Sequence, residues 1–413
     1  MEKKNLLVIS AYTPPNPAVG GKRFAFLNQE FVRHNHEVTV LTLPSKPTAD
    51  SDPSLPLAGN TIQIPSLLPL IPHPENIWAK IYNRLLVSLA SPDQWIGWLL
   101  PVICSGVRQI RAKQVDMLIA TGPPFTSLLA GAILARITGV PLILDYRDPW
   151  TGYMWPKKKF TNPTWHRRLE TWVVHQAAGL VFVTQTMSEA FNSQFSGWLD
   201  KPIRVITNGF LPSPTSDAQK NSGTGGRKKK IIYAGNFYGE RSIGLLLEPL
   251  LLLIQQGKVQ KYEVEVVVFG NLPPSDLTKI HAHDAGALVQ RHDPVPHEKI
   301  MEELRQGDVL YLVSGRDVSY ALPYKIFDYL AAKRPILAVA PRHSEVERFM
   351  AEHRCGLFAP MDDPQRIAHA LDELLTSSET DWDYPHEQYH WPHLAINYMK
   401  FIETLEQDER GQA

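Results

Sequence analysis

The residue types best suited to chemistry occur in residues 322–339, where Lys325 and Asp328 lie three positions apart. The segment predicts a helix that Pro323 opens, followed at once by a buried strand at residues 335–339. Lys325 would lie at the positive end of the helix dipole, a conflict that a bound anion would resolve. Asp328 shares that helix face and could accept hydrogen bonds from sugar hydroxyls. The pattern indicates a nucleoside diphosphate site, and a surface Lys–Asp pair is the alternative.

A second candidate group follows a predicted strand at residues 230–234. Gly235 would let the backbone pass close beneath a nucleotide, and Asn236 next to it is a candidate substrate contact. Arg241 carries a forked, always-charged head that suits phosphate oxygens. The loop therefore predicts a further phosphate contact, and the alternative is a solvated arginine at a helix start.

Charged side chains also end a predicted buried strand at residues 141–145. Asp145, Arg147 and Asp148 would lie at the carboxyl end of a parallel strand, where the sites of α/β proteins are usually found. Asp148 is the better catalytic candidate, and Asp145 and Arg147 are candidate substrate contacts. Arg147 could equally be a buried partner that holds both carboxylates in place.

Gly20 and Gly21 lie between a predicted strand at residues 6–10 and a predicted helix at residues 22–34. Glycine at this place lets the backbone approach a ligand, and the helix tip offers N–H donors to a phosphate. The spacing is that of neither a dinucleotide-binding motif nor a P-loop. A plain turn is the alternative to a phosphate-binding loop.

Strands and helices alternate in both halves of the chain, which predicts parallel sheets. In the first half we expect strands at residues 6–10, 37–42, 116–120, 141–145 and 180–184, and helices at residues 22–34, 125–138 and 163–177. In the second half we expect strands at residues 230–234, 262–270, 288–291, 309–313, 335–339 and 356–359, with helices in the gaps.

The fold class that follows is α/β, with two doubly wound Rossmann-like domains facing each other across a cleft. We expect an N-terminal domain at residues 1–212, a Ser-, Gly- and Lys-rich linker at 213–229 and a C-terminal domain at 230–390. Residues 391–413 form a last helix, which either crosses back to the first domain or ends the second.

Composition argues against several classes of protein. Lysine and arginine number 42, aspartate and glutamate also number 42, and no excess charge favours nucleic acid as a partner. Cys104 and Cys355 fit no metal or redox spacing, and the histidines lack the cysteines or paired carboxylates of a metal site. We expect no metal and no cofactor. Short apolar runs, none long enough for a signal peptide or a membrane span, predict a cytoplasmic protein.

Residues 78–111 mix aromatic with basic side chains, among them Trp78, Trp95, Lys80 and Arg84. Such a mixture suits the headgroup level of a membrane, so peripheral contact with the inner face of the membrane is one interpretation. The packing of amphipathic helices explains the same pattern.

Several of these motifs resemble those of retaining glycosyltransferases of family 4, which have the GT-B fold. Residues 323–335 resemble the family's Pro-x-Lys-x-x-(Glu/Asp)-Tyr-Leu-Ala-x-x-(Arg/Lys)-Pro run, which holds the sugar nucleotide. Residues 20–42 resemble the opening Gly-Gly unit, 145–150 the acceptor-side motif, and 233–241 the phosphate-binding loop. Many members carry two acidic residues around this run, and the first would fall here on Tyr320.

The resemblance implies transfer of a sugar from a nucleotide-diphosphate sugar to a hydroxyl acceptor, with retention of configuration and without a metal. The acceptor would be a glycan or a lipid-linked molecule, in the synthesis of cell-surface polysaccharide or glycolipid. Arg241 and Lys325 would neutralise the departing diphosphate, while Tyr324 and Asp328 would contact the nucleotide. A sugar-nucleotide epimerase of the same architecture, or a non-catalytic relative that binds a nucleotide sugar, are the alternatives.

Overall fold

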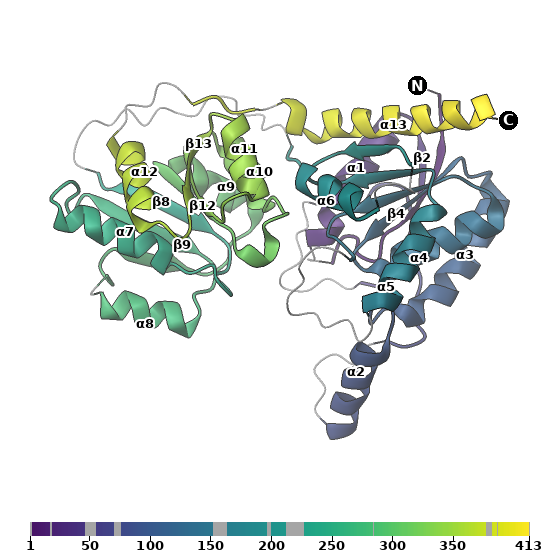
Figure 1. Cartoon of the computed structure of the whole chain (residues 1–413), viewed down its shortest axis with the longest axis horizontal. Coiled ribbons are helices and arrows are strands. Elements are labelled where there is room, and N and C mark those ends of the chain that lie inside the picture. The colour runs from purple at the N-terminus through teal and green to yellow at the C-terminus, as the bar shows by residue number, and fades with distance from the viewer. Residues whose placement is uncertain are drawn as a thin grey trace. The chain divides into compact units, whose positions relative to one another are not determined.

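The computed structural model describes residues 2–16, 19–45, 55–69, 76–151, 163–195, 200–211, 227–283, 285–376, 382–385 and 387–412. The chain forms two units (Figure 1). The first contains Met1–Asn208 and Trp391–Ala413, and the second contains Gly209–His390.

The first unit is built on a seven-stranded sheet whose strands all pair in parallel. The order is β3-β2-β1-β4-β5-β6-β7, so the direction of winding changes between β1 and β4. The strands are β1 (Asn5–Ile9), β2 (Glu37–Thr42), β3 (Asn60–Gln63), β4 (Met117–Gly122), β5 (Leu142–Tyr146), β6 (Gly179–Phe182) and β7 (Ile203–Val205). The helices are α1 (Val19–Arg33), α2 (Ile77–Leu89), α3 (Leu99–Lys113), α4 (Phe125–Thr138), α5 (Pro163–His175), α6 (Gln185–Phe195) and α13 (Trp391–Gln412).

Helix α13 packs on α1 of the first unit, so the chain returns there after the second unit (Figure 1). The ring of Tyr398 lies edge-on to Phe24 and Phe31, with ring centroids 6.3 and 5.6 Å apart. Near the end of the helix, Glu406 pairs with Lys4 at 2.8 Å. The sequence left open whether the last helix crosses back to the first domain or ends the second. In the structure it belongs to the first unit.

The second unit has a six-stranded parallel sheet in the order β10-β9-β8-β11-β12-β13, with its change of winding between β8 and β11. The strands are β8 (Lys229–Ala234), β9 (Val264–Phe269), β10 (Val289–His292), β11 (Val309–Val313), β12 (Ile336–Ala340) and β13 (Gly356–Pro360). The helices are α7 (Gly244–Gln255), α8 (Pro274–Ala282), α9 (His297–Gln306), α10 (Lys325–Ala332), α11 (Glu345–Glu352) and α12 (Pro364–Thr376). The predicted α/β class, with two doubly wound parallel sheets, is confirmed.

Element boundaries differ from the predictions at two places that matter for the site. Helix α1 begins at Val19, which puts Gly20 and Gly21 inside its first turn instead of in a loop before it. Helix α10 begins at Lys325, two residues after the proline that was expected to open it. The short strands β3 and β7 were not predicted, because both are brief and carry few buried apolar residues. Most of the predicted linker, residues 213–229, lies outside the described residues.

Within the described residues, no helix is both long enough and apolar enough to cross a membrane.

Candidate active site

Two glycines bring the loops after β8 and β9 into contact in the second unit. Gly235 has φ +133° and Gly270 has φ +142°, conformations that other residues rarely adopt. A Cβ atom on Gly270 would collide with the carbonyl oxygen of Gly235, so the two backbones touch. The side-chain oxygen of Asn236 accepts a hydrogen bond from the backbone N–H of Asn271 at 2.9 Å. Asn236, predicted as a substrate contact, thus also braces the two loops.

Lys325 points back over the loop after β8. Its Nζ lies 4.0 Å from the centroid of the Tyr233 ring and 2.6 Å from the position that a Cβ atom on Gly235 would take. Glycine at position 235 therefore makes room for the ammonium group. Among the described residues no carboxylate lies within ion-pair distance of Lys325. The structure thus brings together Gly235 and Lys325, two of the candidate site residues.

The surroundings of Lys325 disfavour the charged form of its ammonium group. Burial, and then the positive charge of Arg241, lower the pKa of Lys325 to about 7, while the charge of Asp328 acts in the opposite direction. A cation close to half-ionised at neutral pH gains most when an anion arrives, because the anion restores the charged form. Such a shifted group beside a second cation is typical of a functional site.

Arg241 lies in the same neighbourhood and is largely covered. Its guanidinium lies 4.1 Å from the centroid of the Tyr238 ring and pairs with Asp317 at 3.4 Å. Beside it, Glu240 pairs with Arg316 at 3.1 Å. These two ion pairs join the loop after β8 to the short helix η2 (Arg316–Val318). Because Asp317 is exposed, its hold on Arg241 is weak and open to competition from a stronger anion.

The start of α10 differs from the predicted phosphate-binding helix tip. The N–H groups of Ile326 and Phe327 donate to the carbonyl oxygens of Pro323 and Tyr324, at 3.0 and 3.1 Å. These two amide groups therefore already have partners within the chain. The positive charge that an anion could meet in this segment therefore comes from the side chain of Lys325 and not from these amide groups at the helix tip.

Tyr324 directly precedes α10, and Asp328 lies three residues after Lys325 within it. The carboxylate of Asp328 lies 3.0 Å from the imidazole Nε2 of His297, the first residue of α9. The histidines were expected to form no metal site, and nothing in the spacing of His297 and Asp328 indicated the contact. Tyr320, where the family resemblance would place an acidic residue, is buried in the structure.

In the first unit, Asp145 is fully buried and bonded to Arg23 of α1. The two side chains are 0% and 1% exposed, and Arg23 donates to both carboxylate oxygens at 2.9 to 3.2 Å. The hydroxyl of Thr121 adds a third donor group at 3.0 Å. Asp145 was predicted to contact substrate, but it holds α1 against β5 from inside the unit. Arg23 is a structural partner that sequence analysis missed.

Arg147 fills the space in front of Gly20. Its Nε donates to Thr121 at 3.0 Å and its Nη2 donates to the carbonyl oxygen of Pro123. A Cβ atom on Gly20 would collide with this guanidinium, so glycine is needed here for the packing of Arg147. This contact corrects the prediction that Gly20 leaves room for a phosphate to approach the backbone. Gly21 in contrast faces the Tyr12 carbonyl group, where a Cβ atom would still have about van der Waals spacing.

Asp148, the catalytic candidate, is half-buried beside Arg147. Burial lowers the pKa of Arg147, and the negative charges of Asp148 and Asp145 oppose that shift. The structure therefore brings Arg147, Asp148 and Gly20 together at the carboxyl ends of β1, β4 and β5. This is the edge of the sheet, and the change of winding, where parallel α/β proteins bind ligands.

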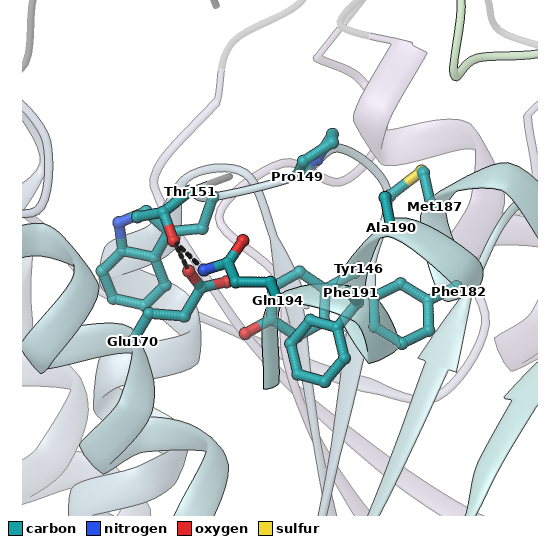
Figure 2. Close-up of a pocket in the computed structure, with 10 residues that line it drawn as sticks. Tyr146, Pro149, Thr151, Glu170, Phe182, Met187, Ala190, Phe191 and Gln194 are labelled. Carbon is teal, nitrogen blue, oxygen red and sulfur yellow. Dashed lines mark hydrogen bonds between the residues drawn. The ribbon is translucent and has the colours of Figure 1, made fainter. Parts of the chain in front are cut away.

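A small cavity is lined in part by Pro149 and Thr151, which follow Asp148 in the chain (Figure 2). Its volume is about 10 Å³, close to the least that one water molecule needs. The buried carboxyl group of Glu170 on α5 accepts a hydrogen bond from the hydroxyl of Thr151. That hydroxyl in turn accepts one from the amide of Gln194 on α6, at 2.7 Å. Burial raises the pKa of Glu170 to about 8, against the effect of its hydrogen bonds.

The proton on Glu170 makes stability depend on pH. Because the folded protein binds this proton up to about pH 8 and the unfolded chain releases it near pH 4.5, the free energy of unfolding falls as pH rises between these values. The slope from this group is about 1.4 kcal/mol per pH unit. We expect Glu170→Gln to lack this contribution, so that urea unfolding of the variant and of the wild type diverges between pH 5 and pH 8. Parallel curves would show that Glu170 is ionised in the folded protein.

Within the described residues, no three His, Cys, Asp or Glu side chains lie close enough together to hold a metal ion.

Known protein families match both units of the chain. The family model described as "Glycosyl transferase 4-like domain" matches residues 21–209, and the one described as "Glycosyl transferases group 1" matches residues 228–377. The protein named "Probable glycosyltransferase WbjE" of Pseudomonas aeruginosa is 25% identical over 278 residues, which are 64% of this chain and 67% of that protein.

Two solved structures show the same fold. Sucrose-phosphate synthase from Thermosynechococcus elongatus has a TM-score of 0.67 at 14% identity, over 98% of this chain and 100% of that one. The UDP-GlcNAc 2-epimerase of Methanocaldococcus jannaschii, in complex with UDP-GlcNAc and UDP, has a TM-score of 0.50 at 11% identity. The match covers 96% of this chain and 99% of that one. Since the two family models between them match residues 21–209 and 228–377, the chain is a glycosyltransferase of group 1, built on the GT-B fold of two Rossmann-like domains.

Proposed function

We propose that the donor is a nucleoside-diphosphate sugar and that the second unit binds its diphosphate. The observation that carries this proposal is the arrangement of Lys325 and Arg241 beside Gly235. Two largely covered cations lie close to each other there, and Lys325 has no carboxylate of the described residues within ion-pair distance. A diphosphate would supply the missing negative charge at the ammonium group of Lys325, which occupies the space that glycine leaves at position 235.

The chemical step in this proposal depends on the leaving group. As the bond between the sugar and the phosphate breaks, negative charge builds on the departing diphosphate, and fixed cations stabilise that charge most effectively in a covered site. Lys325 and Arg241 would do this without a metal ion. Asp328 would accept hydrogen bonds from the ribose, and Tyr324 and Asn236 would contact the nucleotide.

The sugar would pass to a hydroxyl group of a glycan or lipid-linked acceptor, with retention of configuration. Asp148 of the first unit, half-buried beside Arg147, would accept a hydrogen bond from that hydroxyl. The guanidinium of Arg147 beside it would help to hold the carboxylate in place. We place the reaction in the synthesis of cell-surface polysaccharide or glycolipid.

A thermal-shift panel of UDP, GDP, ADP and dTDP tests the donor proposal. A ligand that binds the folded state at a hundred times its Kd adds about 2.7 kcal/mol to stability, so a bound nucleotide must raise the melting temperature. No rise with any of the four would contradict a nucleoside-diphosphate donor. Isomerisation of UDP-GlcNAc in the absence of an acceptor would instead indicate an epimerase, an activity that a structural relative with the same fold carries.

We also propose that α2 places the protein at the inner, cytoplasmic face of a membrane with anionic lipids. Four apolar side chains share one face of α2 and are exposed, Ile77, Trp78, Ile81 and Leu85, with Trp78 at 76%. The exposed Lys80 and Arg84 lie beside this face. In Figure 1 the helix extends away from the sheet of its unit. An apolar face next to basic residues is typical of helices that lie in the headgroup region.

Vesicle flotation measures this contact. We expect the wild type to float with vesicles containing phosphatidylglycerol and to float less with purely zwitterionic ones. Trp78→Ser with Ile81→Ser should weaken the binding at least about tenfold, since each buried apolar side chain contributes about 1.5–3 kcal/mol. The control is Tyr262→Ser, an exposed aromatic residue of the second unit. Equal flotation of both variants would contradict a role for α2.

A further inference from the structure

His297 holds one oxygen of the Asp328 carboxylate. The imidazole Nε2 lies 3.0 Å from Oδ1, and the two side chains come from neighbouring helices, α9 and α10. The Asp328 side chain is 20% exposed and that of His297 is 38% exposed, so both reach the surface at this point. Asp328 is also close enough to Lys325 for its charge to act on the ammonium group. Asp328 thus interacts with both the ammonium group and the imidazole.

The hydrogen bond restricts how the carboxylate can turn. A carboxylate has two oxygens that each accept more than one hydrogen bond, and in an exposed aspartate both rotate freely. With Oδ1 held by His297, Oδ2 keeps one direction and, among the described residues, has no hydrogen bond of its own. A carboxylate that is already oriented loses less freedom when it binds a ligand.

We infer that His297 is a positioning residue for donor binding, which orients Asp328 so that Oδ2 accepts hydrogen bonds from the ribose hydroxyls of the nucleoside diphosphate. This inference rests on the proposed function, because it needs the diphosphate at Lys325 and Arg241. The alternative is a hydrogen bond near the surface that contributes little to donor binding. The two differ in a measurable way, since a positioning residue acts only through Asp328.

A double-mutant cycle measures that dependence. The affinity of UDP and GDP, and of their 2′-deoxy counterparts, is determined by calorimetry for the wild type, His297→Ala, Asp328→Asn and the double variant. We expect Asp328→Asn to weaken ribonucleotide binding about tenfold and His297→Ala about fivefold, with no further loss in the double variant. For the 2′-deoxy nucleotides both losses should shrink. His297→Gln, whose amide can donate from nearly the same position, should restore most of the affinity.

The outcomes separate the inference from the proposal beneath it. If the wild type binds and Asp328→Asn weakens binding, but His297→Ala does not, His297 has no positioning role. Losses that multiply in the double variant would also overturn the inference, because His297 would then act independently of Asp328. If the wild type binds none of the nucleotides, the proposed function fails and the inference with it. His281→Ala, an exposed histidine on α8, and the melting temperature of each unliganded variant are the controls for folding.

Discussion

Replacing Lys325 with alanine is expected to weaken nucleoside diphosphate binding roughly ten- to a hundredfold. A hydrogen bond to a charged group contributes about 1.5–3 kcal/mol, and each 1.4 kcal/mol is tenfold in affinity. The protein itself should stay folded, because the substitution removes a cation that lies near Arg241 without a bonded carboxylate among the described residues. Calorimetric titration of UDP and GDP measures the loss.

The matched control is Lys299→Ala, an exposed lysine on α9 of the same unit, which should bind as the wild type does. Arg241→Ala should change affinity in the same direction as Lys325→Ala. If the wild type binds and both Lys325→Ala and Arg241→Ala keep its affinity, the diphosphate does not bind at this loop.

Asp145→Asn is expected to lower the free energy of unfolding by about 3–5 kcal/mol. The change leaves the guanidinium of Arg23, which is 1% exposed, without its counter-charge inside the first unit. Urea unfolding, followed by a signal from that unit, measures the effect. The double change of Arg23→Met with Asp145→Leu should be milder than either single change, since it leaves no buried charge behind. A loss below about 1 kcal/mol for Asp145→Asn would show that the pair is not desolvated.

The fold could be predicted because its signals are local. Strands buried on both faces, such as β12 (Ile336–Ala340), appear in the sequence as continuous apolar runs, and their alternation with helices requires a parallel sheet. The same rule places the loops after β8 and β5 at the carboxyl edges of their sheets. Candidate residues on those loops, such as Arg241 and Asp148, could therefore be found without coordinates.

The partners of those candidates could not be found in this way. A sequence does not show which side chains that lie far apart along the chain are in contact in the fold. Arg23 and Asp145 are 122 positions apart, and His297 and Asp328 are 31 apart. A single arginine near the start of a helix, or a histidine after a proline, carries no signal for its partner. Glu170 was missed for the same reason, since a carboxyl group on a helix normally faces water.

Two predictions failed on local geometry. Pro323 suggested the start of a helix, but the chain makes 3₁₀-type hydrogen bonds at this point and α10 begins at Lys325. Gly20 suggested an open approach for a ligand, whereas its missing side chain accommodates Arg147. In both cases the residue type indicated what the backbone or the space at that position could accommodate. The sequence did not reveal which contacts form there.

The most direct measurement is the number of protons taken up when a nucleoside diphosphate binds. With a pKa of about 7 for Lys325, roughly nine-tenths of the ammonium groups are neutral at pH 8, and a bound diphosphate should restore their charge. Titration at pH 8 in two buffers of different ionisation enthalpy should therefore give an uptake of about 0.9 proton per nucleotide bound. Lys325→Ala should take up none. Tight binding by the wild type without proton uptake would contradict a Lys325 that is neutral in the free protein and charged by the bound diphosphate.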